Sequence, residues 1–246
     1  MESDQTESDP SLQHLKHLKH LKDSTMNTRT ASHTPSFPTQ PIKLHRVAIS
    51  GHAHRVELFL SLLGLPFERV DIDLAARAHK TPEFLAMNAF GQVPVIQDGD
   101  VTLADSNAIL VYLAGRYAQD AGAWMPRDPV AAAAVQRWLS VAAGPLAFGP
   151  AAARVIQLFK KPDSPDEAIA RAHALFTVME QQLEHSTFLA GSTPTLADIA
   201  NYSYTAHAPE GNVSLEPYPR LRAWLARIEA LPRFVPMVKT PVGLAA

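Results

Sequence analysis

The sequence predicts an α/β domain followed by an all-helical domain. Three observations lead to this prediction. Strand and helix patterns alternate over residues 43–117, a hairpin signal, Asp98-Gly99, separates two short strands, and no convincing strand pattern follows Tyr117. Alternating elements with one antiparallel pair are typical of a mixed sheet covered by helices, rather than of a barrel or a sandwich.

The first domain has a local signal for each of its elements. Apolar residues recur at helical spacing over residues 55–63, and Gly64 ends this helix. Asp105 begins a later helix whose apolar residues share one face. The predicted strands cover residues 43–50, 67–72, 95–97 and 101–103, and a short helix covers residues 82–87.

The second domain shows only helical patterns, at residues 131–143 and 168–185. Thr195 and Asp198 have the spacing of a capping box, with Asp in place of the usual Glu. The last helix, residues 220–231, ends before Pro232, as the steric restriction ahead of proline requires. We therefore divide the chain into a tail (1–41), an α/β domain (42–117), a linker (118–128) and a helical domain (129–246).

The tail differs from the rest in composition. It is rich in Ser, Thr, Asp and Pro and contains a repeated His-Leu-Lys triplet over residues 14–22, so we expect it to be largely disordered. The repeat could bind a metal or form a short cationic helix, but its single Leu stripe is narrow, which favours a solvated tail. Met26 offers a second plausible start, so residues 1–25 are also compatible with an over-extended gene start.

Composition excludes several classes of function. The 22 Lys and Arg against 24 Asp and Glu give a net charge of −2, which provides no extended field for nucleic acid or an anionic membrane. The chain has no cysteine, which excludes disulfides, thiolate metal sites and a cysteine nucleophile, so any reactive sulfur must come from a ligand. We expect no membrane-spanning run of about 18 apolar residues and no secretory signal, and take a cytoplasmic location as the default.

Four motifs occur in a fixed order along the chain. They are Ser50-Gly51-His52-Ala53-His54-Arg55-Val56, Phe90-Gly91-Gln92-Val93-Pro94-Val95 with Asp98-Gly99-Asp100, Ala104-Asp105-Ser106-Asn107-Ala108-Ile109, and the helix cap from Thr195 to Asp198. On these motifs, the chain from Lys43 to about Val238 resembles the cytosolic glutathione transferase family, and most strongly its serine-type branch with the plant phi class and many bacterial relatives. The resemblance implies that the first domain is thioredoxin-like.

The resemblance implies a site for the anionic tripeptide glutathione. Val93 would pair with the middle of the ligand through its backbone, with a cis bond before Pro94 at a cost of about 0.5 to 1 kcal/mol; the alternative is an ordinary trans proline that opens a strand. Asp105 and Ser106, at a helix start, would hold the γ-glutamyl carboxylate and the neighbouring ammonium, or merely cap the helix. The family more often has Glu in place of Asp105.

The glycyl end of glutathione would lie near the start of the short helix at residues 82–87. Serine-type relatives place residues that hold the glycyl carboxylate there, and His79 and Lys80 occupy this position. Gln92 can add a side-chain hydrogen bond.

Ser50 would carry the chemistry, by analogy with serine-type relatives. A hydroxyl directed at the sulfur donates a hydrogen bond to the thiolate and lowers its pKa from about 8.5; the alternative is that Ser50 only caps the helix. His52 replaces an Asn that many bacterial relatives carry. It could be a second catalytic donor, a substrate contact or an exposed loop residue, and a pKa near 6.5 would make activity pH-dependent. We expect His54 to face solvent or a dimer partner, and Arg55 to brace the fold or the subunit interface.

The resemblance implies an enzyme of detoxification that acts as a two-fold homodimer. It would conjugate the thiolate of reduced glutathione to a small apolar electrophile between the domains, with no metal. Two alternatives remain open: glutathione-dependent disulfide reduction or isomerisation, and a non-enzymatic interaction module. Candidates to line the electrophile site are Trp138, Phe148, Tyr204 and His207.

Overall fold

A four-stranded mixed sheet forms the first part of the chain, as the sequence predicts. The computed structural model describes residues 37–245. In the strand order β2-β1-β3-β4, β1 (Ile42–Arg46) is parallel to β2 (Phe67–Asp71) and antiparallel to β3 (Val95–Asp98), and β4 (Val101–Ala104) completes the predicted hairpin with β3. The predictions for residues 1–36, including the triplet repeat, lie outside the described residues.

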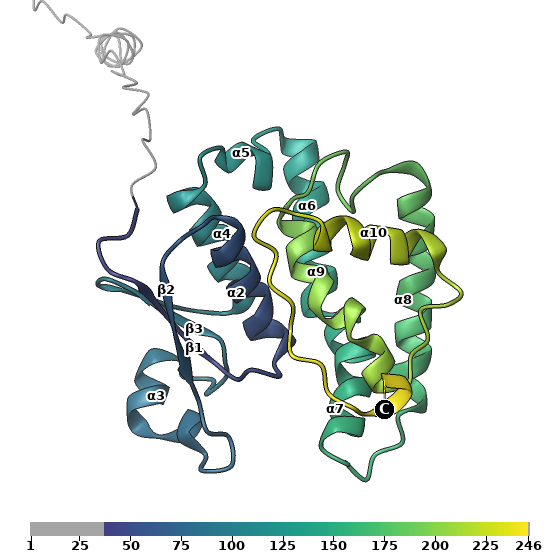
Figure 1. Ribbon diagram of the computed structural model, residues 1–246, viewed down its shortest axis with the longest axis horizontal. Helices are drawn as coiled ribbons and strands as arrows, with labels where there is room; N and C mark the ends of the chain where they lie inside the picture. The colour runs from purple at the N-terminus through teal and green to yellow at the C-terminus, as the bar shows by residue number, and fades with distance from the viewer. Residues whose placement is uncertain (1–36, 246) are drawn as a thin grey trace, which may run out of the picture. The chain divides into compact units, whose positions relative to one another are not determined.

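Helices cover the sheet, with α2 (Gly51–Leu62) and α4 (Ser106–Tyr117) on the side of the helical domain. In Figure 1, α3 (Pro82–Met87) lies at the side of the sheet away from that domain, next to the short helix η1 (Ala78–Lys80) in the sequence. Strand β1 ends four residues before the predicted limit because Val47 accepts a hydrogen bond from the Ser50 N–H in a turn, at 2.9 Å. Helix α2 begins at Gly51, earlier than predicted.

The remainder of the chain is helical, which confirms the predicted fold class. Helix α9 (Leu196–Ala206) is central, since every residue from Leu196 to Thr205 is buried. The capping box of Thr195 and Asp198 is present at its start. The predicted linker contains the short helix α5 (Ala121–Trp124). The other elements are α6 (Pro129–Ala143), η2 (Ala147–Ala151), α7 (Ala152–Leu158), α8 (Asp166–His185), η3 (Ala208–Gly211), α10 (Pro219–Glu229) and η4 (Gly243–Ala245).

After α10, the chain returns across the first domain. We call residues 232–242 the C-terminal segment; in Figure 1 it is the yellow trace between the sheet domain and the helices. The Ser61 hydroxyl donates to the Arg233 carbonyl at 2.7 Å, and the His54 ring bonds the Val235 carbonyl at 2.9 Å. His54 is therefore buried between α2, α9 and this segment, and the expectation that it faces solvent or a partner is wrong.

One apolar helical stretch is longer than expected from the sequence, which predicted no run of about 18 apolar residues. The helical run Pro129–Leu158 is long and apolar enough, by length and composition alone, to cross a membrane. However, α6 packs its apolar side chains Val135, Trp138 and Leu139 into the core, and α7 carries the buried, ion-paired Arg154. We therefore interpret the run as a core helix of a folded domain.

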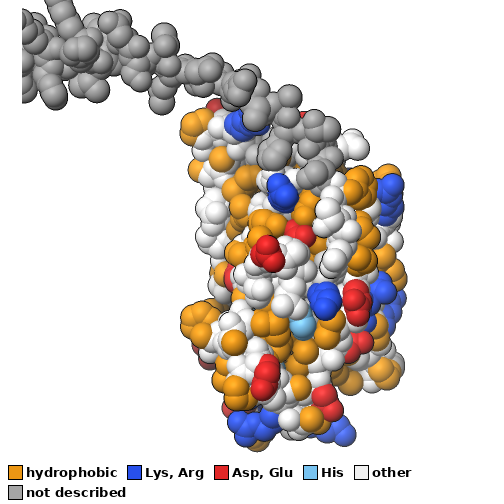
Figure 2. Space-filling model, turned by 90° about the vertical axis from the view of Figure 1, so that its left-hand side faces the viewer, with side chains coloured by type: hydrophobic (Ala, Val, Ile, Leu, Met, Phe, Trp, Pro, Cys, Tyr) orange, Lys and Arg blue, Asp and Glu red, His pale blue; other side chains and the backbone are white. Residues whose placement is uncertain are grey.

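The surface in Figure 2 mixes both signs of charge. Basic and acidic side chains alternate there among apolar ones, and neither sign dominates this face. A face of this kind offers no extended positive field to a polyanion.

Candidate functional site

A cavity of ≈740 Å³ lies beside the edge of the sheet where β4 leads into α4. Loops and helix starts from four separate stretches of the chain line it, so the fold assembles the site from distant segments. The lining residues are His52, Leu74, His79, Lys80, Asn88, Phe90, Gly91, Gln92, Val93, Pro94, Ala104, Asp105 and Ser106. Eight of the nine predicted site residues are among them, and Ser50 is not.

One end of the cavity is the start of α4. Asp105 is the N-cap, and its Oδ1 accepts from the N–H groups of Asn107 and Ala108 at 3.0 and 2.9 Å. Its φ of 69° is unusual for a residue other than glycine, and such backbone strain is typical of functional sites. The capping role considered from the sequence is therefore present, while Oδ2 has no partner within residues 37–245.

A buried cation lies behind this end. The Arg55 Nη1 donates to the Ser106 Oγ at 3.1 Å and to the Asn107 Oδ1 at 2.8 Å, so Arg55 braces α2 against α4. Burial lowers its pKa to about 10, against the raising effect of Tyr204 and Asp105, and the guanidinium stays charged at neutral pH. Within the described residues it has no carboxylate at salt-bridge distance. Its charge therefore favours an anion near Ser106.

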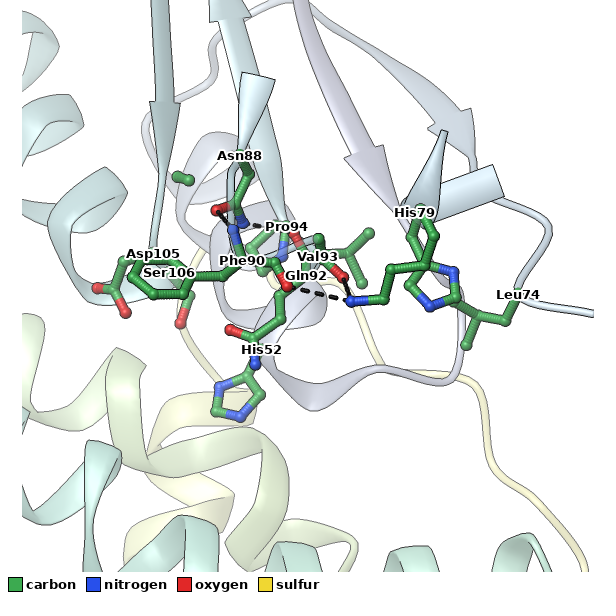
Figure 3. Close-up of a pocket in the computed structure, with 13 residues that line it drawn as sticks. His52, Leu74, His79, Asn88, Phe90, Gln92, Val93, Pro94, Asp105 and Ser106 are labelled. Atoms are coloured by element: carbon green, nitrogen blue, oxygen red, sulfur yellow. Dashed lines mark hydrogen bonds between the residues drawn. The ribbon is translucent and has the colours of Figure 1, made fainter. Parts of the chain in front are cut away.

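The opposite end of the cavity is formed by the η1 residues. In Figure 3, His79 and Leu74 lie at one end of the site and Asp105 at the other, with Gln92, Val93 and Pro94 between them. Lys80 Nζ donates to the carbonyls of Phe90 and Gly91 at 3.2 and 3.1 Å, which leaves one of its three N–H groups for a ligand.

The loop between the two ends is held by a residue that the sequence analysis missed. Asn88 donates to the Gln92 carbonyl at 2.8 Å and accepts from the Phe90 N–H at 3.1 Å. The Val93–Pro94 peptide bond is cis. Val93 lies outside the regular elements, and its backbone N–H and C=O have no partner within residues 37–245. The only sequence signal for Asn88 was the tendency of Asn to form such local turns.

Ser50 is the N-cap of α2, outside the cavity lining. Its Oγ accepts from the Ala53 N–H at 3.3 Å, so the capping alternative is realised. A hydroxyl accepts and donates at the same time, and no described residue takes the Ser50 hydroxyl hydrogen. The group is therefore free to donate to a ligand at the start of α2.

His52 belongs to α2 and lines the cavity. Its ring packs edge-on against Tyr204, with the centroids 5.0 Å apart. Burial, aided by the charge of Arg55, lowers the pKa of His52 to about 3. The surroundings of His52 therefore disfavour the charged ring, in contrast to the pKa near 6.5 considered from the sequence.

The four residues expected to line an electrophile site do not border this cavity. Trp138 is a core residue, 2% exposed, and Phe148 is 61% exposed on the surface. His207 is buried against Glu210. Tyr204 covers Gly51, where a Cβ atom would lie 2.8 Å from its ring, and contacts His52. Within residues 37–245, no cluster of three or more His, Cys, Asp or Glu side chains could hold a metal ion.

Two family models match the chain. Residues 41–115 match "Glutathione S-transferase, N-terminal domain", and residues 136–232 match "Glutathione S-transferase, C-terminal domain". Glutathione S-transferase 3 of Zea mays is 37% identical over 207 residues, which cover 79% of this chain and 91% of that protein. Human glutathione S-transferase theta-2B is 34% identical over 191 residues, covering 74% and 78%.

Solved structures show the same fold. The glutathione S-transferase of Pseudomonas fluorescens superposes with a TM-score of 0.76 at 33% identity, covering 81% of this chain and all of that one. A glutathione transferase homolog from Drosophila mojavensis, solved with bound glutathione, has a TM-score of 0.71 at 29% identity and covers 78% and 89%.

Proposed function

Because this chain belongs to the glutathione S-transferase family, we propose that it binds reduced glutathione along the cavity and transfers its sulfur to a small apolar electrophile. The observation that carries this proposal is the charge pattern around the cavity. Lys80 and the buried Arg55 supply two cations, and Asp105 supplies one carboxylate. Glutathione carries two carboxylates and one ammonium, so the signs match group for group.

The ligand would lie with its γ-glutamyl end at α4. The start of that helix, with Arg55 behind Ser106, favours the α-carboxylate, and the free Oδ2 of Asp105 can accept from the α-ammonium. The unpaired backbone groups of Val93 would bond the cysteinyl unit, as one strand bonds another. Lys80, His79 and Gln92 would hold the glycyl carboxylate at the other end.

Ser50 would then stabilise the thiolate. The thiol of free glutathione is mostly protonated at neutral pH, and a hydroxyl that donates to the sulfur favours the charged form. The start of α2 adds a positive potential there. The thiol proton is released to solvent, the thiolate forms a bond to the electrophilic carbon, and with an aryl halide the carbon–halogen bond breaks and halide leaves. A neutral donor of this kind requires no His-Asp relay.

Calorimetry and activity assays together test this proposal. We expect reduced glutathione to bind in a one-to-one complex, and turnover with an aromatic halide to exceed turnover with a small disulfide. Faster reduction of the disulfide would replace conjugation by disulfide exchange, since the chain has no cysteine of its own and the ligand thiolate would be the nucleophile. Absence of binding would overturn the enzyme proposal in favour of an interaction module.

We also propose that two copies form a two-fold dimer through the face that carries α4. Phe90 is 80% exposed and Val111 of α4 is 41% exposed, and a groove of ≈290 Å³ separates α4 from α6. Burial of such side chains contributes about 25 cal/mol per Å² of apolar surface removed from water. Light scattering is expected to give twice the chain mass of 26.8 kDa, and a monomer at micromolar concentration would contradict this proposal.

A further inference from the structure

Arg154 connects the helical domain to the residue that precedes Ser50. It lies in α7 and is 1% exposed. Its Nη1 donates to the Ile49 carbonyl at 2.7 Å, and its Nε donates to the Glu210 Oε2 at 2.7 Å. A charge-assisted bond from a buried arginine fixes the carbonyl that it contacts more firmly than a neutral donor would.

Glu210 is the centre of a buried polar group that we call the Arg154 cluster: Arg154, Glu210, His207 and Thr240. Glu210 accepts from the His207 Nδ1 at 2.6 Å, from the Thr240 N–H at 3.2 Å and from the Thr240 hydroxyl. Burial alone would raise the pKa of Glu210, but the hydrogen bonds from Thr240, His207 and Arg154 hold it below its usual value. Burial lowers the pKa of His207 despite Glu210, so the cluster pairs one cation with one anion.

The peptide unit between Ile49 and Ser50 is held from both sides. Its carbonyl accepts from Arg154, and its N–H, which belongs to Ser50, donates to the Val47 carbonyl at 2.9 Å. This plane positions the N–Cα bond of Ser50, and the next peptide plane is held by the bond from the His54 N–H to the Ser50 carbonyl, at 2.9 Å. With the planes on both sides held, Ser50 keeps φ −86° and ψ 117°, and these torsions set the direction of its Cα–Cβ bond. The Arg154 cluster therefore holds one of the two peptide planes that orient the Ser50 side chain.

Stability alone does not account for this arrangement. Replacing a buried ion pair with apolar side chains is often neutral or stabilising, so such a pair is weak evidence for a stabilising role. Arg154 also leaves its Nη2 without a partner within residues 37–245, which adds to its cost. A role in orienting the loop before α2 would explain why the Arg154 guanidinium is buried despite this cost in free energy.

We propose that Arg154 is a positioning residue for the Ser50 hydroxyl, and that Thr240 of the C-terminal segment supports it by holding Glu210. This proposal rests on the proposed function, in which Ser50 stabilises the thiolate. In this proposal the C-terminal segment takes part in activating the thiol, although it lies far from Ser50 in the sequence.

The test uses a double-mutant cycle on the full-length protein, with the pKa of enzyme-bound glutathione read from thiolate absorbance. Arg154→Met is expected to raise the pKa of the bound thiol and, at pH values below the wild-type pKa, to lower kcat/KM about tenfold. The glutathione Kd should change about twofold or less. Arg154→Lys should restore part of the effect, and Thr240→Val should reproduce part of it without removing a charge. In the Ser50→Ala background, the same changes at Arg154 and Thr240 should leave the thiol pKa unaltered.

A matched control separates positioning from stability. Trp224→Phe breaks a buried hydrogen bond from Nε1 to Asp198, far along the chain from the Ile49 carbonyl that Arg154 bonds, so it should lower stability while leaving the thiol pKa unchanged. If Arg154→Lys and Thr240→Val fold and leave the thiol pKa at the wild-type value, the positioning role is overturned even if Arg154→Met fails to fold. If Ser50→Ala itself leaves that pKa unchanged, the role of Ser50 in the proposed function fails, which is distinguishable from failure of the positioning role of Arg154.

Discussion

Protonation of His54 should destabilise the folded protein. The Val235 carbonyl can only accept, so Nε2 carries the hydrogen, and Nδ1 accepts from the Ser203 hydroxyl at 2.8 Å. Burial lowers the pKa of His54 to about 4, with opposing effects of Val235 and Glu57, whereas an unfolded chain has a His pKa near 6.5. The unfolded state therefore binds the proton first as the pH falls.

The linkage relation gives the size of this effect. The stabilisation that neutral His54 contributes is fully present above the pKa of His54 in the unfolded chain. It is lost as the pH falls toward the pKa of His54 in the folded protein, by ~2 kcal/mol between about pH 7.5 and about pH 5. Other groups add their own dependence, so the relevant quantity is the difference between wild type and His54→Gln. Gln keeps a donor for Val235 but does not titrate.

Urea denaturation at the two pH values measures this difference. Wild type should lose ~2 kcal/mol more than His54→Gln. Ser203→Ala is the matched control: it removes the bond to Nδ1 but leaves the ring buried, so it should lower stability at both pH values and keep the wild-type pH dependence. Equal losses in wild type and His54→Gln would refute the argument that burial of His54 sets this dependence.

Three further predictions concern other residues. Asp198→Ala removes the acceptor of four buried hydrogen bonds and should cost about 3 to 5 kcal/mol of unfolding free energy, whereas a loss below about 1 kcal/mol in calorimetry would contradict the cap's role. Gly51→Ala places a Cβ 2.8 Å from the Tyr204 ring and should destabilise by about 1 to 3 kcal/mol in urea unfolding; a more stable variant would show that Tyr204 yields easily. Asp105→Asn keeps the cap but removes the charge, so calorimetry should show glutathione Kd rising about tenfold, whereas Asp128→Asn, the same change at the α6 cap, should leave Kd unchanged. Equal Kd values for the two variants would remove Asp105 from the binding site.

The sequence predicted those features whose signals are local. The hairpin at Asp98-Gly99, the capping box at Thr195 and the helix that Gly64 ends each depend on residues within a few positions of one another, and the structure has all three. The cavity was also predictable in outline, because residues at the ends of sheet elements meet at one edge.

The features that the sequence did not reveal depend on distant contacts. His54 contacts residues 149 and 181 positions away, and Arg154 bonds a carbonyl 105 positions away, so no local pattern encodes their burial. Pro150 lies inside the helical run that leads to Arg154, and proline normally argues against a helix. Trp138 has the spacing of a helix face, which does not distinguish a core residue from one that lines a ligand site.

We expect the Ser50 hydroxyl to lower the thiol pKa of bound glutathione. Thiolate absorbance across pH, measured on saturated complexes of wild type and Ser50→Gly, tests it most directly, because glycine costs a helix N-cap only a few tenths of a kcal/mol. We predict a bound thiol pKa well below about 8.5 in wild type and near that value in Ser50→Gly, with glutathione still bound. The same depressed pKa in both proteins would contradict the account and leave Ser50 as a helix cap alone.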